Sequence, residues 1–129
     1  MDALNIEEKS GQPWASQIPG KMHACGHDGH TSTILALAKY LSETKNFDGV
    51  ATLVFQPAEE GGRGAFQMLE EGVLGRVPFD EIYGFHNWPH LPRGVFAIRS
   101  GPMLAAVDEF EIRLQGHGGH AAMPHNYGM

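Results

Sequence analysis

The histidines of this chain gather in three groups, together with other side chains that bind metal ions. The first group lies in HACGHDGH, residues 23–30, and includes Cys25, and the others lie in FHNWPH, residues 85–90, and GHGGHAAMPH, residues 116–125. Imidazole and thiolate groups, like carboxylates, supply lone pairs to divalent ions. This clustering indicates a metal site rather than scattered surface histidines.

Cys25 and His27 are two residues apart. In an extended segment their side chains point to the same side, so both can reach one ion. The alternative is a buried free cysteine beside histidines that cap a helix. One short motif does not decide between these interpretations. The decision therefore depends on the other candidate metal-binding segments.

Two adjacent carboxylates, Glu59 and Glu60, follow the apolar run 50–56. One can bind a metal ion while the other acts as general base toward a bound water. The alternative is a solvated pair at a helix start, which the helix dipole favours. His86 stands at the end of another apolar segment. It is either a metal ligand or a core histidine whose hydrogen bonds are satisfied. Together, the three segments favour a metal site.

Regular elements must position these side chains. The runs 50–56 and 81–86 are rich in β-forming residues and predict strands, the first of them parallel and covered on both faces. A helix is predicted between them, from residue 62 or 64 to 74. Another is predicted over residues 28–42, with Asp28 as a candidate N-cap. Its apolar residues recur at helical spacing: Ile34, Leu35, Leu37, Ala38 and Leu41.

Strand, helix and strand in this order form a crossover unit. The predicted fold class is therefore α/β, as part of a doubly wound, largely parallel sheet with helices on its faces. Ligands of such sheets bind at the carboxyl ends of the strands, where the metal-binding segments can converge. Residues 108–116 alternate apolar and charged side chains and predict a strand of a different, more exposed sheet. We place a domain boundary near Ala106, between residues 1–106 and 107–129.

Composition narrows the class of partner. The 129 residues carry a net charge of −6, which argues against a nucleic-acid or anionic-membrane surface and favours a small molecule. A lone cysteine forms no internal disulfide, and no apolar run reaches membrane-spanning length. No signal peptide precedes the polar start. We therefore expect a cytoplasmic protein. A chain of this length can bury a hydrophobic core without disulfides. Neither a GxSxG elbow nor a phosphate-binding glycine loop is present, which argues against a serine nucleophile and against a phosphate-binding site.

Six motifs carry a resemblance to a known family. They are MDAL, HACGHD, FQPAEEGGRGA, GFHNWP, GPMLAAVDEFEI and GHGGHAAMPH, in the order seen in metal-dependent amidohydrolases. The sequence resembles the hippurate hydrolase and indoleacetyl-amino-acid hydrolase group, which is related to aminoacylases and carboxypeptidases. The resemblance covers nearly all of the chain.

This resemblance implies a catalytic domain that holds one or two divalent ions (Zn, Mn, Co or Ni) and an inserted lid and dimerisation domain that begins near Val107. By motif, Glu59 matches the general base, His120 the lid histidine that stabilises the oxyanion, and Asp2 a residue that orients a metal ligand. The role of His125 stays open between a family function and a structural one. The implied metal ligands are Cys25, His27, Glu60 and His86.

The implied activity is metal-dependent hydrolysis of the amide bond of N-acyl amino acids, in a homodimeric parent enzyme. Family members continue beyond both ends of this sequence, and the last histidine ligand lies downstream, so we expect a fragment. Two alternatives are kept. One is a deacetylase of an N-acetylated diamino acid, and the other is a non-catalytic, truncated metal-binding fragment, for which the exposed strand 108–116 is the motive.

Overall fold

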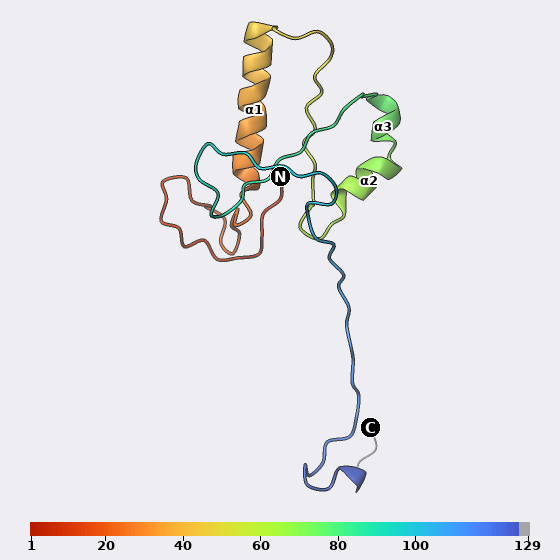
Figure 1. The fold of residues 1–129 in the computed structure, drawn as a ribbon. Helices are drawn as coiled ribbons and strands as arrows, with labels where there is room; N and C mark the ends of the chain where they lie inside the picture. The colour runs from red at the N-terminus through yellow and green to blue at the C-terminus, as the bar shows by residue number, and fades with distance from the viewer. Residues whose placement is uncertain (127–129) are drawn as a thin grey trace. The chain divides into compact units, whose positions relative to one another are not determined.

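The computed structural model describes residues 1–126, which form two compact units. The first unit is Met1–His90 and the second begins at Leu91. In chain order the helical segments are α1 (His27–Thr44), α2 (Gly64–Glu70), α3 (Val73–Arg76) and the 3₁₀ turn η1 (Pro124–Asn126) (Figure 1). The predicted boundary near Ala106 lies inside the second unit and stays a prediction.

The helix predicted over residues 28–42 is present as α1. Backbone φ angles of 84° at Gly26 and 48° at Lys45 end it on both sides, and the Lys45 N–H donates to the Leu41 carbonyl, which closes the last turn. The N-cap is Gly26, so the prediction that Asp28 caps the helix is wrong. Asp28 lies instead in the first turn, where its charge complements the positive end of the helix dipole.

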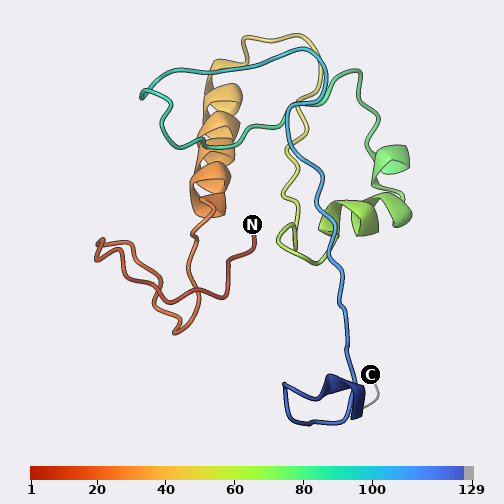
Figure 2. The same ribbon diagram turned by 60° about the horizontal axis from the view of Figure 1, so that its bottom comes forward.

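The second predicted helix begins at Gly64 as expected, but it is divided in two. Gly72, with φ 78°, separates α2 from α3. A left-handed residue ends one helix and redirects the chain, and glycine adopts that conformation without the steric cost of a Cβ. Figure 2 shows α1 (orange) as one long helix and α2 and α3 (green) as two short ones.

The predicted strands form no ladder within residues 1–126. Residues 50–56, 81–86 and 108–116 have no strand assignment there, and the pairing described is a single antiparallel bridge between Leu4 and Met22, with N···O distances of 3.0 and 3.1 Å. A strand needs a partner to satisfy its backbone N–H and C=O groups. The doubly wound sheet and the strand of the inserted domain therefore stay predictions.

Apolar side chains remain largely exposed. None is buried among the described residues, and Val50 and Leu114 are 94% and 93% exposed. Residues 1–126 therefore contain no buried hydrophobic core, and the runs predicted as strands have no sheet neighbours there. No helix in this part of the chain has the length and apolarity needed to cross a membrane. The long-range side-chain contacts of the first unit are instead polar, as described next.

Candidate metal centre

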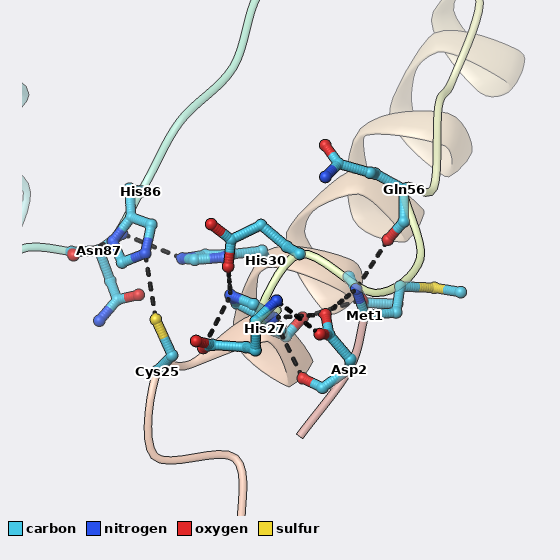
Figure 3. A network of polar contacts seen from close by, with 11 residues as sticks. Met1, Asp2, Cys25, His27, His30, Gln56, His86 and Asn87 are labelled. Carbon is cyan, nitrogen blue, oxygen red and sulfur yellow. Dashed lines mark hydrogen bonds and ion pairs between the residues drawn. The ribbon is translucent and has the colours of Figure 1, made fainter. Parts of the chain in front are cut away.

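Four stretches of the first unit bring their polar side chains together at the start of α1 (Figure 3). The donor atoms of Cys25, His27 and His86 lie within 4.8 Å of one another, and so do those of His27, Glu59 and Glu60. His27 belongs to both groups. Among the described residues the structure thus brings together every ligand that the sequence predicted, although the roles of these residues stay predictions.

His27 lies at the centre of the cluster and is the one buried polar side chain of the described chain, with 7% exposure. Its Nδ1 lies 3.1 Å from the carbonyl oxygen of Asp2 and 3.3 Å from the Oδ1 of the same residue. Both atoms are acceptors, so the neutral ring carries its proton on Nδ1. Its Nε2 lone pair then faces Glu59 Oε2 and Glu60 Oε1, each at 3.7 Å.

The same logic orients His86. Its Nδ1 lies 2.6 Å from the Asn87 carbonyl oxygen, which accepts the ring proton, and its Nε2 lies 3.3 Å from Cys25 Sγ. Two imidazole lone pairs, one thiol and two carboxylates therefore form two donor groups that meet at His27. Each histidine is held by an acceptor behind it, which is the usual arrangement for metal-binding imidazoles.

Asp2 joins the cluster from behind. Its Oδ2 accepts the Glu60 backbone N–H at 2.8 Å, while its buried Oδ1 accepts no hydrogen bond. Burial raises the pKa of Asp2, but hydrogen bonds from backbone N–H groups, that of Glu60 foremost, outweigh it and lower the value to about 2. Asp2 is therefore an anion beside His27, placed as the resemblance implies for a residue that orients a ligand.

The two glutamates lie on a tightly wound loop. Ala58 has a φ of 49°, and its carbonyl accepts the N–H groups of both Gly62 and Gly64 at 3.1 Å. A Cβ on Gly64 would lie 1.7 Å from the Pro57 carbonyl oxygen, and one on Gly62 would lie 2.5 Å from the Ala58 Cβ. The GGRG sequence therefore serves the close winding of this loop, which lies beside the cluster.

The electrostatics of the cluster favour a cation. Burial raises the pKa of the Cys25 thiol, and contacts with Glu60 and the charges of Glu59 and Asp2 raise it further. Within residues 1–126, Glu59 and Glu60 form no ion pair with a lysine or arginine. Two carboxylates without a lysine or arginine partner, beside thiol and imidazole donors, fit a bound divalent ion.

His30 belongs to one of the histidine groups of the sequence, but no role is predicted for it. Asn87 is not among the predicted site residues. The Asn87 backbone N–H donates to His30 Nε2 at 3.0 Å, and burial lowers the pKa of His30. The signal available was the His27–His30 spacing, which puts both residues on one face of a helix. Asn87 had no comparable signal.

The remaining predicted residues lie in the second unit. The Ala122 N–H donates to His120 Nδ1 at 3.2 Å, so the neutral ring of His120 carries its proton on Nε2 and can donate from there. His125 lies in η1 and is exposed. Its role stays open.

Comparisons with known proteins support the resemblance. The chain is 47% identical to N-acetyl-L-cysteine deacetylase of Bacillus subtilis (strain 168), over 98% of this chain and 30% of the relative. It is 44% identical to hippurate hydrolase of Campylobacter jejuni subsp. jejuni serotype O:2 (96% and 32%) and 48% identical to IAA-amino acid hydrolase ILR1-like 4 of Arabidopsis thaliana (96% and 28%). The chain thus spans about a third of the length of these relatives. No solved structure matches it.

The family model described as peptidase family M20/M25/M40 matches residues 1–127. That match covers nearly the whole sequence and includes each motif on which the resemblance rests. The predicted family relationship is thereby confirmed: this chain belongs to peptidase family M20/M25/M40, a family of metal-dependent hydrolases.

Proposed function

We propose that the native polypeptide, meaning the whole chain that its gene encodes, hydrolyses the amide bond of N-acyl amino acids at a metal site built from the first unit. The observation that carries the proposal is the convergence of donor atoms around His27, with both groups inside 4.8 Å. The names of the relatives support the substrate class, since the names of all three specify an acyl group on an amino acid or a hydrolase of such a compound.

The side chains that would hold the ion are Cys25, His27, Glu60 and His86. A divalent ion bound by them would lower the pKa of a water and polarise a carbonyl oxygen. One or two ions fit the proposal, and His27 would bind one of them, because its neutral ring has a single lone pair on Nε2. Zn, Mn, Co and Ni are the candidates, and a thiolate ligand favours the softer ones.

The two glutamates differ in a way that supports separate roles. The side chain of Glu60 is 22% exposed and its backbone N–H is fixed by Asp2, whereas the side chain of Glu59 is 57% exposed. An immobile carboxylate suits a ligand, and a freer one suits a group that moves protons. Glu59 then accepts a proton from the attacking water and returns it to the departing amine.

His120 is the proposed oxyanion donor. Its Nδ1 is occupied by the Ala122 N–H, which leaves Nε2–H as the donor of the neutral ring. A donor fixed in this tautomer needs no proton transfer before it stabilises negative charge on the substrate oxygen. The homodimer that the resemblance implies stays a prediction, and so does the cytoplasmic location.

The proposed function is tested with the metal-loaded native polypeptide. It should release amine from a panel of N-acetyl and N-aroyl amino acids, and chelation should abolish this activity. Inclusion of N-acetylated diamino acids in the panel separates the aminoacylase from the diamino-acid deacetylase. Metal uptake without hydrolysis of any member would instead support the non-catalytic alternative.

Cys25 gives a direct test of the donor set. In the native polypeptide, bound metal should protect this thiol from alkylation at neutral pH, and chelation should expose it, because a ligand thiolate cannot attack the reagent while it binds the ion. The extent of labelling is read from the mass of the peptide that contains Cys25. Cys25→Ser should also weaken metal retention, since a hydroxyl is a poorer ligand.

His23→Leu is the matched control, because His23 is exposed and close in sequence but lies outside the donor groups. It should leave labelling and metal content unchanged. Equal labelling of Cys25 with and without metal, with unchanged metal content in the serine variant, would remove Cys25 from the site.

A further inference from the structure

His30 contacts three consecutive residues of the segment that carries His86. Its ring centroid lies 5.3 Å from that of Phe85 and 4.8 Å from that of His86, in edge-on geometry. Its Nε2 lies 3.0 Å from the Asn87 backbone nitrogen, a contact that spans 57 residues of sequence. Residues 81–86 form no strand ladder in the described chain. The His30 contacts, together with the edge-on approach of the His27 and His86 rings (centroids 6.4 Å apart), therefore connect the segment to α1.

The hydrogen bond also fixes what His30 can do. A backbone N–H only donates, so His30 Nε2 must be the acceptor, and its lone pair is not available for a metal ion. His27 and His30 lie on one face of α1, with ring centroids 5.6 Å apart. Their spacing suggests a pair of metal ligands. However, His27 belongs to both donor groups, whereas His30 belongs to neither.

The Asn87 backbone connects His30 to His86. Its N–H is held by His30, and its carbonyl oxygen accepts the proton of His86 Nδ1 at 2.6 Å. Its side chain lies against Gly26, where a Cβ would be 2.7 Å from Oδ1 of Asn87. Asn87 is therefore fixed on both sides, and the direction of the His86 Nε2 lone pair follows from its position (Figure 3).

We propose that His30 is a positioning residue that acts through the Asn87 backbone to aim His86 Nε2 at the donor cluster. The proposal rests on the proposed function in one respect, namely that His86 is a metal ligand. It assigns His30 no contact with substrate or ion. It predicts that an acceptor at the place of Nε2, and not the ring as such, is what the site requires.

The first experiment needs no metal. In the metal-free, ¹⁵N-labelled native polypeptide, an N–H···N hydrogen bond should give a scalar coupling between the Asn87 amide nitrogen and His30 Nε2, measured by NMR. The absence of that coupling would overturn the proposal. This outcome is independent of whether the enzyme binds metal or hydrolyses anything, so it is separable from failure of the proposed function.

The second experiment compares three variants by their affinity for Zn²⁺ alone. His30→Gln places an amide oxygen near the position of Nε2 and should bind Zn²⁺ nearly as well as the wild type. His30→Asn is too short to reach Asn87, and His30→Leu has no acceptor, so both should lose about tenfold or more in affinity, as is typical when the support of a ligand is removed. His23→Leu is again the control and should not differ from the wild type.

The comparison of His30→Gln with His30→Asn keeps the test decisive even if His30→Leu fails to fold, because both amides are polar and helix-compatible. Equal affinities of these two variants would overturn the proposal. A wild-type protein that takes up no Zn²⁺ would contradict the proposed function, while the NMR coupling would still decide whether His30 holds Asn87.

Discussion

Replacing Glu59 by glutamine in the native polypeptide is expected to lower kcat for N-acyl amino acid hydrolysis by roughly 10²–10⁴-fold, the usual contribution of a general base. Glutamine has nearly the same shape but accepts no proton from water. The affinity for divalent cations should change little, because the proposed ligand is the neighbouring Glu60. Steady-state kinetics and metal analysis of the same preparation measure both quantities.

Glu60→Gln is the matched control, since it makes the same chemical change one residue away. It should lower metal affinity first and lose activity as a consequence, so that excess metal restores part of the rate. The assignment of the two roles would be wrong if Glu59→Gln retained turnover, or if it lost metal as readily as Glu60→Gln.

Gly64→Ala is expected to damage both the stability of the protein and its metal site. The added Cβ would lie 1.7 Å from the Pro57 carbonyl oxygen, and the pyrrolidine ring limits how far that residue can move. Overpacking of this kind costs about 1–3 kcal/mol of the free energy of unfolding. The same shift would displace Glu59 and Glu60, so thermal unfolding and metal titration should both report the change.

Gly75→Ala serves as the control. Gly75 lies within α3, where a Cβ meets nothing within 4 Å, so alanine should stabilise the helix by about 0.5–1 kcal/mol and leave metal affinity unchanged. If Gly64→Ala behaved like Gly75→Ala, the close approach of Gly64 to Pro57 would not constrain the loop of the two glutamates.

The local elements were predictable from the sequence because their causes are local. The apolar spacing in residues 28–42 depends only on the chain itself, and it matches α1 to within two residues at each end. The division between α2 and α3 was missed because the conformation of Gly72 is not readable from an isolated glycine in a helical pattern.

The sheet is a different matter, since strand pairing is non-local. Residues 50–56 have the composition of a covered strand, but composition says nothing about which segment supplies the neighbouring strand. The chain spans about a third of the length of its relatives. Pairing partners can therefore not be identified from these residues, and the α/β class stays a prediction.

The site was predictable as a set of residue types but not as a set of roles. Cys25, His27 and His86 are metal-binding types in crossover-spaced segments, and that was enough to expect them together. The division of labour between Glu59 and Glu60 depends on exposure and on the hydrogen bond to Asp2, which adjacency in sequence does not reveal. His30 shows the converse, because it is a metal-binding type whose Nε2 accepts a hydrogen bond from Asn87 and which lies outside the donor groups.

The polar centre also bears on how the first unit is held together. Its hydrogen bonds join Asp2 to Glu60 and Cys25 to His86 across 58 and 61 residues of chain, in a structure whose described part buries no apolar side chain. A cation bound by these segments would act as a cross-link that closes long loops, and the entropy lost by the unfolded chain would count toward the stability of the native state. Metal occupancy and folding would then be one linked equilibrium, in which the resistance of this unit to unfolding rises with the free concentration of the ion.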